Sequence, residues 1–280
     1  MSAVALAYAY EPESEPTQAP EAAPNKAAAR VAQLLDKIDY RLTETEEDWA
    51  AIGRLRYEAY LREGAINPDP SQSFTDPHDD DKNAWTFGVY IDDQLAASLR
   101  LHVATNDCPL LPSLSVFPDL LEPKLQAGKT IVDATRLVTD RQLARLCPSL
   151  LYATVRLCWM ATVHFKAEDT LSAVRPEHQA FYRRTFNQRP ICGPRSYPLL
   201  NKPISLMTAN YREVSDYVYR RYPFFRSTYF ERRMLFERPR PVVPASIVPA
   251  PDAEQPPVPS IAPNASYDGG QLLLFPGQAG

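Results

Sequence analysis

Apolar residues recur along the middle of the chain with the period of a helix in two early segments. Val31, Leu34 and Leu35 share one helix face, and the same spacing continues in a second segment that a Thr-Glu-Thr-Glu start signal opens. The pattern predicts helices over Ala27–Lys37 and Glu46–Arg62. In the second of these, Arg56 lies beside the apolar stripe rather than on the polar side.

Strand-like segments follow and alternate with further helices. Trp85–Ile91 and Leu95–Val103 predict a hairpin closed by a turn at Asp92-Asp93-Gln94. The other predicted elements are a short strand at Tyr40–Leu42, strand Thr130–Asp140, helix Pro148–Phe165, strand Thr170–Val174, helix Pro176–Asn187, strand Ile204–Asn210 and helix Tyr211–Arg221. Residues 63–83 and 104–129 are predicted to be long irregular connections.

The strand Thr130–Asp140 carries charged groups within a β-branched, apolar sequence. Asp133 and Thr135 share one face, and Arg136 points to the other face unless a bulge re-aims it. Two interpretations stay open at this point. The acid and the arginine either form a buried structural ion pair, or the strand lines a cleft.

Composition separates the ends of the chain from its middle. Residues 1–24 are rich in Ala, Pro and Glu, and residues 239–280 hold ten of the 28 prolines, which predicts two disordered tails around a folded domain over residues 25–238. No apolar run reaches the roughly 18–20 residues of a membrane-spanning helix. The N-terminal apolar stretch is short and lacks a basic flank, so we expect a cytoplasmic protein.

Neither the cysteines nor the aspartates have the spacing of a known metal site. The four cysteines are far apart with no CxxC pair, which favours reduced thiols over a disulfide frame or a zinc site. Asp76, Asp79, Asp80 and Asp81 are close together, but they lack the glycine and the terminal glutamate of an EF-hand loop. We therefore predict no bound metal.

The net charge of −4 hides a basic second half. Residues 141–240 hold 18 basic and 7 acidic side chains, a balance of +11. Such a surface suits an anionic partner, which is nucleic acid, a phosphate-bearing cofactor or an acidic protein, although a plain solvated face has the same composition. No basic helix with interleaved aromatic residues indicates a nucleic-acid recognition element.

Four short motifs stand along the predicted elements and their connections. They are Arg56-Tyr57, the pair Asp76 and Asp79, Arg100-Leu101 with Phe117 downstream, and Asp133-Ala134-Thr135-Arg136. These motifs and the order of elements resemble the GNAT acyltransferase fold, and within it the autoinducer-synthase branch with its FeeM-like N-acyl amino acid synthases. Residues 181–186, FYRRTF, are also similar to a GNAT segment, with Thr185 where a glycine is usual. The resemblance implies an α/β fold with a mixed, mostly antiparallel central sheet flanked by helices.

One departure from the general GNAT pattern bears on the acyl donor. GNAT enzymes that use acyl-CoA hold its pyrophosphate on a glycine-rich loop after the fourth strand, but residues 141–149 contain no glycine. The resemblance therefore implies an acyl carrier protein thioester as donor, with acyl-CoA as the alternative and no bound cofactor. Arg141, Arg145 and Arg156 are the expected contacts of the acidic carrier protein.

The resemblance implies N-acyl transfer from that thioester to the amine of an amino acid. Asp133 is the candidate proton acceptor, directly or through a water, and Arg100 and Arg136 are the candidates that orient it or bind the acceptor carboxylate. Tyr182 is a candidate proton donor to the leaving thiolate, although a core or capping role fits it equally. The expected substrate-binding residues are Arg56, Asp76, Asp79, Thr135, Phe117 and Trp159, and core packing is the competing interpretation for the last two.

Other functions remain as alternatives. An acyl-homoserine-lactone synthase would bind S-adenosylmethionine, but residues 60–66 lack the tryptophan that typically encloses it in that branch. A non-catalytic module that binds acyl chains or carrier protein would not need Asp133 beside two arginines. In the C-terminal tail, Gln271–Phe275 is similar to the QLxLF docking peptide of sliding-clamp partners, although a chance match explains it as well.

Overall fold

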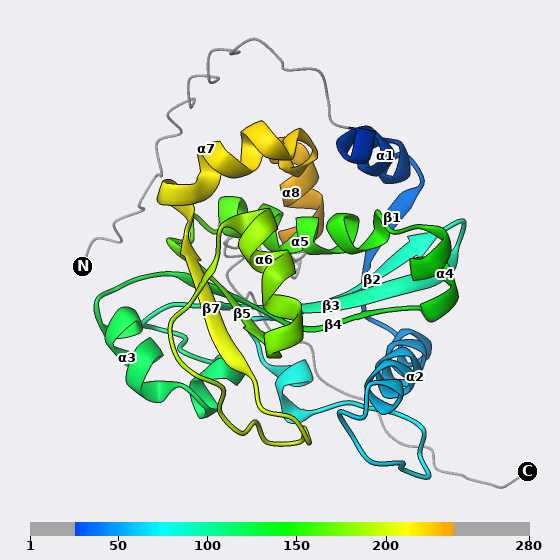
Figure 1. Ribbon diagram of the computed structural model, residues 1–280, viewed down its shortest axis with the longest axis horizontal. Coiled ribbons are helices and arrows are strands. Elements are labelled where there is room, and N and C mark those ends of the chain that lie inside the picture. The colour runs from blue at the N-terminus through cyan, green and yellow to red at the C-terminus, as the bar shows by residue number, and fades with distance from the viewer. Residues whose placement is uncertain (1–25, 238–280) are drawn as a thin grey trace, which may run out of the picture. The chain divides into compact units, whose positions relative to one another are not determined.

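A seven-stranded sheet runs through residues 26–237, the part of the chain that a computed structural model describes (Figure 1). Its strand order is β1-β2-β3-β4-β5-β7-β6. Every neighbouring pair is antiparallel except β4 and β5, which are parallel. The mixed, mostly antiparallel sheet predicted from the sequence is confirmed.

The strands begin and end close to the predicted positions. They are β1 (Ile38–Leu42), β2 (Ala84–Ile91), β3 (Gln94–Ala104), β4 (Ile131–Thr139), β5 (Asp169–Val174), β6 (Arg189–Pro190) and β7 (Ser205–Asn210). The β2–β3 hairpin closes with Ile91 opposite Gln94. Asp92 and Asp93 between them have positive φ angles of 49° and 61°, as the type I′ turn requires.

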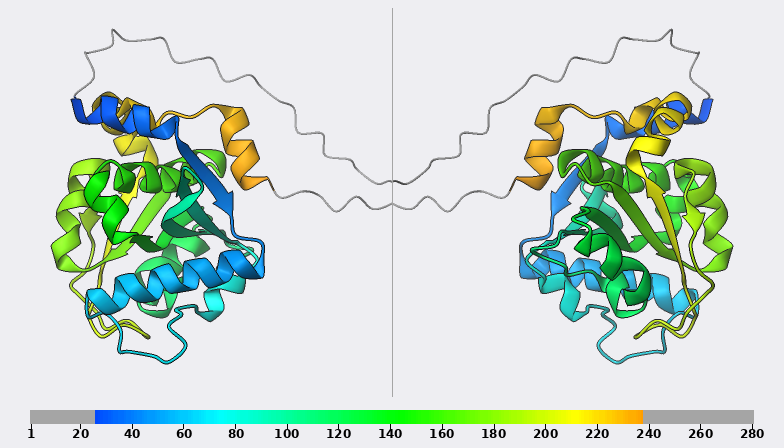
Figure 2. Two further views of the ribbon diagram at one scale, coloured as in Figure 1. Left: turned by 90° about the vertical axis from the view of Figure 1, so that its right-hand side faces the viewer. Right: turned by 90° about the vertical axis from the view of Figure 1, so that its left-hand side faces the viewer.

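Helices cover both faces of the sheet. They are α1 (Lys26–Leu35), α2 (Glu46–Arg62), α3 (Pro118–Gln126), α4 (Arg141–Leu146), α5 (Leu150–His164), α6 (Gln179–Phe186), α7 (Tyr211–Arg221) and α8 (Tyr229–Phe236), with 3-10 turns η1 (Pro77–Asp80), η2 (Pro112–Ser115), η3 (Pro176–His178) and η4 (Pro223–Phe225). Helices α5, α7 and α8 lie on one side of the sheet, and α2 and α3 lie on the other (Figures 1 and 2).

Local sequence explains the confirmed elements and one that was missed. Thr45 caps α2 in a capping box with Asp48, so this helix starts where the sequence predicted. The connection 104–129 is not irregular throughout, because it contains η2 and α3. Pro118 begins α3, whose interior Pro123 obscures the helical pattern although Leu121 and Leu125 are buried on one face.

The alternation of β3 sends its polar residues to the side opposite α5. Leu99 and Leu101 pack into the core under α5, so Arg100 and His102 face the side of α2 and η1. A second core, with Phe117 and Leu121, occupies that same side of the sheet further along. The charged residues of β3 and β4 therefore lie between α2 and this second core.

The one parallel pair in the sheet separates partway along its length. β4 and β5 pair from Ile131–Asp169 to Ala134–Ser172 and no further. β5 stays paired with β7 up to Val174, so it is the β4–β5 seam alone that opens. The edge of β4 that faces β5 is therefore unpaired beyond Ala134.

Several predictions concern residues outside the described part. The two predicted tails, residues 1–24 and 239–280, and the segment Gln271–Phe275 lie there, and the domain boundaries stay predictions. Within residues 26–237, no helix combines the length and the apolar character needed to cross a membrane. Cys108, Cys147, Cys158 and Cys192 are free thiols.

Candidate active site

A cleft of about 290 Å³ opens where β4 and β5 part. One wall is the unpaired edge of β4 at residues 135–139, and the facing wall is residues 173–175 of β5 and its end. The outer walls come from the C-terminal end of α2, from α6 and from the segment before β7. The cleft therefore exposes the backbone edge of a central strand to a substrate.

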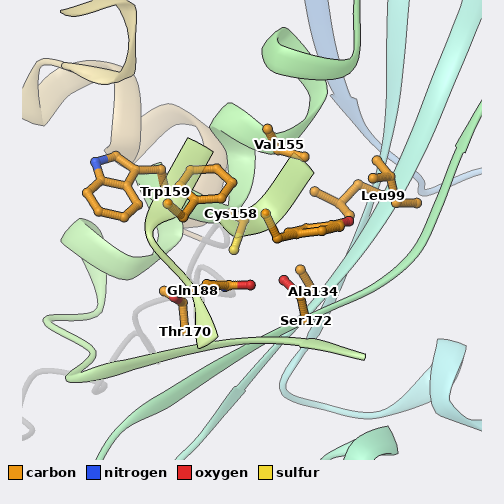
Figure 3. A pocket seen from close by; sticks show the side chains of 11 residues that line it. Leu99, Ala134, Val155, Cys158, Trp159, Thr170, Ser172 and Gln188 are labelled. Carbon is orange, nitrogen blue, oxygen red and sulfur yellow. Dashed lines mark hydrogen bonds between the residues drawn. The ribbon is translucent and has the colours of Figure 1, made fainter. Parts of the chain in front are cut away.

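A smaller cavity continues from the cleft into the molecule. It measures about 10 Å³ and shares Ala134, Leu137 and Tyr182 with the cleft. Most of its other walls are apolar or aromatic, with three polar side chains gathered at one end (Figure 3). The apolar or weakly polar lining residues are Leu99, Val155, Cys158, Trp159 and Phe186, and the polar ones are Thr170, Ser172 and Gln188. This inner cavity has room for about one water-sized sphere.

β4 bulges at Arg136, beside the mouth of the inner cavity. Ser98 of β3 pairs with Val138, but Arg100 pairs with Thr135, so two β4 residues stand opposite Leu99. Arg136 has a φ of 55°, a left-handed conformation that is uncommon for a residue with a Cβ. The bulge brings Arg136 to the side of Thr135 and Arg100, which strict alternation would not allow.

Five residues from four parts of the chain, α2, the η1 turn with its cap, β3 and β4, form a continuous ladder of ion pairs. Arg136 binds Asp76 through Nε at 2.7 Å, and Arg100 Nη1 binds the other oxygen of Asp76 at 2.7 Å. The same Arg100 nitrogen donates to Asp79 at 2.9 Å. Arg56 Nη1 then contacts both oxygens of Asp79 at 2.9 Å. We call this set, Arg136–Asp76–Arg100–Asp79–Arg56, the ion-pair ladder.

The ladder is almost fully removed from water. The side chains of Arg56, Arg100 and Asp76 are 0% exposed. Burial alone would raise the pKa of Asp76, but hydrogen bonds and charges from Arg100 and Arg136 outweigh it and hold the pKa well below its ordinary value. Breaking a buried ion pair by removing one partner typically costs about 3–5 kcal/mol, although an aspartate with two arginine partners keeps one of them when the other is removed.

The structure shows Arg100 and Arg56 in buried ion pairs, and their expected roles toward a substrate stay predictions. Both are fully buried, both are bound to aspartates, and neither lines the cleft or the inner cavity. Asp76 and Asp79, expected to contact substrate, hold the arginines instead. Among the ladder residues, Arg136 is the one that lines the cleft. Arg100 also donates to Thr135 Oγ1 at 3.2 Å and so positions a second cleft residue.

Aromatic rings surround the guanidinium group of Arg136. Its central carbon lies 4.9 Å from the ring centre of Phe74 and 5.8 Å from those of Tyr60 and Tyr197. Gly53 of α2 permits the approach of the segment that carries Phe74, because a Cβ there would lie 2.3 Å from Ser73 Oγ. Burial would lower the Arg136 pKa, but Tyr60 and Asp76 raise it above its ordinary value, so Arg136 is a fixed cation.

Asp133 lies next to the cleft without reaching it. The side chain is fully buried, and one carboxylate oxygen accepts the Ser113 backbone N–H at 3.2 Å while the other has no hydrogen-bond partner among residues 26–237. Burial raises the Asp133 pKa, and the hydrogen bond from Ser113 offsets only part of this. Asp133 lines neither cavity, so direct contact with a substrate amine is not part of this geometry.

The three expected aromatic site residues occupy different places. Tyr182 lines both cavities, and burial raises its pKa, so the phenol stays protonated at neutral pH. Trp159 lines the inner cavity while stacking on Phe186 with ring centres 5.6 Å apart, so it packs the core and lines a cavity at once. Phe117 is fully buried in the second core and lines neither cavity, which favours the packing interpretation.

The expected carrier-protein contacts are also divided. Arg141 and Arg145 are exposed on α4, which lies between cleft residues Thr139 and Leu151. Arg156 is buried, and its side chain pairs with Glu231 and donates to the backbone oxygens of Phe224 and Arg226. Arg156 thus ties α5 to the α8 region, and its contact with a carrier protein stays a prediction that this burial does not favour.

The cleft is richer in cations than the sequence indicated. Its lining includes Arg62, Arg136, Arg175 and Lys202, against a single acid, Glu63. Arg175 pairs with Glu63, and Lys202 Nζ donates to the Glu63 backbone oxygen at 2.9 Å. Lys202 and Arg175 were missed because they stand in loops far apart in sequence, and no local pattern marks them as neighbours.

A mixed sheet whose central parallel pair splays over a cleft is the architecture of the GNAT acyltransferases. The sequence matches the family "N-acyl amino acid synthase FeeM" over residues 51–210. That stretch is more than half of the chain and contains the ladder, the bulge and all of the residues that line the cleft. The chain therefore belongs to the FeeM family and is an N-acyltransferase.

The solved structure of FeeM has the same fold at low sequence identity, and two further solved structures are less similar. FeeM, an N-acyl amino acid synthase from uncultured soil microbes, has a TM-score of 0.53 and 16% identity, and the match covers 64% of this chain and 93% of that one. TofI has a TM-score of 0.47 and 12% identity over 62% and 91% of the two chains. The AHL synthase LasI has a TM-score of 0.47 and 11% identity over 61% and 89%. No curated protein sequence matches this chain.

Proposed function

We propose that this protein transfers a fatty acyl group from an acyl carrier protein thioester to the amine of an amino acid. The observation that carries the proposal is the cleft itself, in which an unpaired strand edge faces a cation-rich wall. The edge of β4 at residues 135–139 suits a pantetheine thioester, which hydrogen-bonds along a strand. The cations suit a carboxylate on the acceptor.

The backbone after β4 favours a carrier protein over CoA as donor. The Asp140 carboxylate accepts the backbone N–H groups of Gln142 and Leu143 at 2.9 and 2.8 Å. In acyl-CoA-using GNAT enzymes, amides at this place hold the pyrophosphate. A pyrophosphate here would have to displace a carboxylate of the protein itself. An acyl carrier protein has a single phosphate, at the base of its phosphopantetheine arm, and docks through its own surface. Only the pantetheine thioester therefore has to enter the cleft, and no pyrophosphate has to be bound.

The acyl chain is proposed to enter the inner cavity. That cavity shares the cleft wall at Ala134, Leu137 and Tyr182, and apolar side chains of α5 and α6 line its path. Its small volume requires those side chains to move apart when a chain enters, since an acyl chain is far larger than one water. Tyr182, which lines both cavities, is our proposed hydrogen-bond donor to the departing thiolate.

The acceptor amine has to lose a proton before it attacks the thioester. We propose that Asp133 accepts that proton through a water molecule. Asp133 is next in sequence to Ala134, which lines the cleft, and burial raises the pKa of its carboxyl group. Arg136 is proposed to bind the carboxylate of the acceptor. Its φ angle, its aromatic surroundings and its bond to Asp76 fix the guanidinium before substrate arrives.

An assay of the purified full-length protein tests the reaction. It is incubated with long-chain acyl carrier protein and either mixed amino acids or S-adenosylmethionine, and the products are analysed by mass spectrometry. We expect an open N-acyl amino acid from the first mixture. A lactone with released methylthioadenosine from the second mixture would contradict the acceptor assignment.

The same assay tests Asp133. The near-isosteric Asp133→Asn variant should turn over about 100-fold more slowly, since general-base catalysis contributes about that much or more. Folding should persist, because the amide retains an oxygen that can accept the Ser113 N–H. Normal turnover by folded Asp133→Asn protein would remove Asp133 from the mechanism and leave the family assignment untouched.

A further inference from the structure

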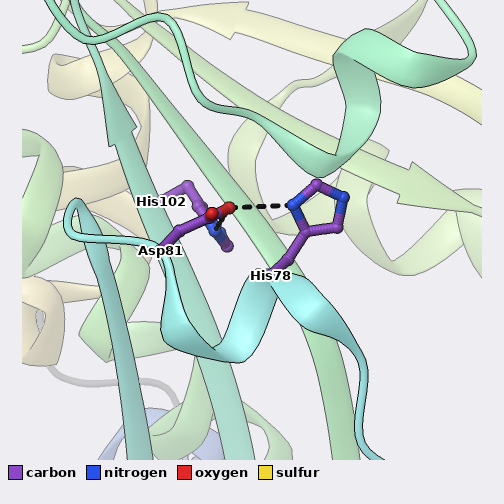
Figure 4. Close-up of side chains that lie close together, drawn as sticks. All are labelled: His78, Asp81 and His102. Carbon is purple, nitrogen blue, oxygen red and sulfur yellow. Dashed lines mark hydrogen bonds and ion pairs between the residues drawn. The ribbon is translucent and has the colours of Figure 1, made fainter.

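Two histidines and an aspartate converge beside the ion-pair ladder, away from the cleft (Figure 4). His78 belongs to η1, Asp81 follows η1, and His102 lies on β3. His78 Nδ1 is 2.8 Å and His102 Nε2 is 3.2 Å from the same Asp81 oxygen. The three atoms lie within 4.8 Å of one another.

We propose that His78, Asp81 and His102 bind a divalent transition metal ion, with zinc as the best fit. Zinc holds imidazole nitrogens at about 2.0–2.1 Å and carboxylate oxygens at about 2.0–2.2 Å in a tetrahedron, whose neighbouring ligand atoms are then roughly 3.4 Å apart. The two contacts of Asp81 with the imidazoles are already close to that separation.

The donor set selects among metals. Two imidazole nitrogens and one carboxylate oxygen suit zinc and its transition-metal neighbours, whereas calcium and magnesium prefer oxygen ligands throughout. Three protein ligands leave a fourth position for water. An ion can reach the site from solvent, because the side chains of His78 and Asp81 are 36% and 19% exposed. The His102 side chain is fully buried.

The local charges permit a cation at this place. The neighbouring aspartates, Asp76 and Asp79, are bound to the three arginines of the ladder. Asp81 makes its hydrogen bonds with the two imidazoles instead. Arg100, two residues from His102, is the nearest repulsive charge on β3, and Asp76 and Asp79 compensate it.

A metal ion at this site would cross-link η1 to β3. The turn η1 and the residue before it carry Asp76 and Asp79, which hold Arg136 and Arg100 in place. A metal ion bound by His78 and Asp81 together with His102 would hold η1 against β3. None of the three ligands lines the cleft. Metal binding can therefore be tested separately from the proposed reaction.

Titration of the purified full-length protein with the metal alone tests the site. After removal of any affinity tag and dialysis against a chelator, we expect calorimetry with zinc chloride to give one equivalent bound. His78→Ala and Asp81→Asn should each weaken that binding more than about 100-fold, since even the loss of an outer partner of a metal ligand costs about 10- to 100-fold. Cobalt(II) should give visible absorption bands in the wild type that both variants lack.

His178→Ala is the matched control, because it removes one half-exposed imidazole from another part of the molecule. It should bind zinc as the wild type does. Zinc should also raise the melting temperature of the wild type and the control, but not that of His78→Ala. Failure of the wild type to bind zinc at micromolar concentration, or equal binding by all variants, would overturn the proposal.

Discussion

The three arginines of the ladder have the same chemistry but different surroundings. Arg56 and Arg100 are fully buried, whereas Arg136 keeps one side on the cleft. Asp76 holds Arg136 and Arg100 together, and Asp79 holds Arg100 and Arg56. The central arginine is therefore a structural group, and the one at the bulge is available for binding.

Substitution of the central and the terminal arginine should separate stability from turnover. Arg136→Gln leaves Asp76 paired with Arg100, so we expect a folded enzyme whose kcat/KM is lower by about 100-fold, the usual scale of a lost electrostatic contact. Arg100→Gln removes the cation that both aspartates share and should cost about 3–5 kcal/mol of unfolding free energy. Urea unfolding and steady-state kinetics on both variants measure the two effects.

The reverse pattern would contradict this division of roles. An Arg100→Gln protein as stable as the wild type would show that the ladder does not depend on its centre. Normal kinetics for Arg136→Gln would show that the acceptor carboxylate binds elsewhere, and Lys202 or Arg175 on the same cleft would then be the remaining cations to test.

At the scale of elements, amphipathic period and capping were enough to predict most of the fold. Helix Glu46–Arg62 and helix Tyr211–Arg221 have the predicted bounds, because their start signals and apolar faces are local. Helices α3, α4 and α8 were missed. Pro123 interrupts the pattern of α3, and α4 has only six residues, too few to show a period.

The site was predictable where it rests on adjacent residues and not where it rests on tertiary contact. Asp133, Thr135 and Arg136 are adjacent, and their strand was recognised. The sequence could not place Asp133 behind the cleft wall or Arg156 against Glu231, because burial depends on elements remote in the chain. The sequence allowed a bulge at Arg136 but could not show that one forms, because the register shift arises from the pairing of β4 with β3.

The packing of α5 against β4 should set the length of the acyl chain. Cys158 of α5 lines the inner cavity, so Cys158→Phe should block the path and shift the products toward shorter acyl chains. Met160→Phe on the same helix is the matched control, because Met160 belongs to the core under α5 and lines neither cavity. Both should lose about 1–3 kcal/mol of stability through overpacking.

Mass spectrometry of the products made from a mixture of acyl carrier proteins distinguishes the two variants. We expect shorter products from Cys158→Phe and wild-type lengths from Met160→Phe. The same product lengths from both variants would place the acyl chain outside the inner cavity, while the transfer reaction itself would remain as proposed.

At the scale of the whole molecule, the charge is unevenly distributed along the chain. Residues 141–240 carry 18 basic and 7 acidic side chains, and part of that excess stands beside the cleft. On α4, Arg141 and Arg145 are exposed next to Leu146, which is 82% exposed. A basic surface with one apolar side chain suits an acidic helical partner, since the charges steer the encounter and the apolar contact excludes water.

Reversal of these charges should impair use of the carrier protein without altering the chemistry. In Arg141→Glu/Arg145→Glu, KM for acyl carrier protein should rise roughly 10-fold or more at low salt, because rim charges act mainly on association. Its kcat should stay the same, and high salt should bring the wild-type KM toward that of the variant. Arg212→Glu/Arg220→Glu on α7 makes the same change in net charge at exposed positions that line neither cavity. An equal KM increase in both double variants would indicate a general charge effect and refute docking at α4. A wild-type KM that is insensitive to salt, with equal use of acyl-CoA, would refute the carrier protein as the preferred donor.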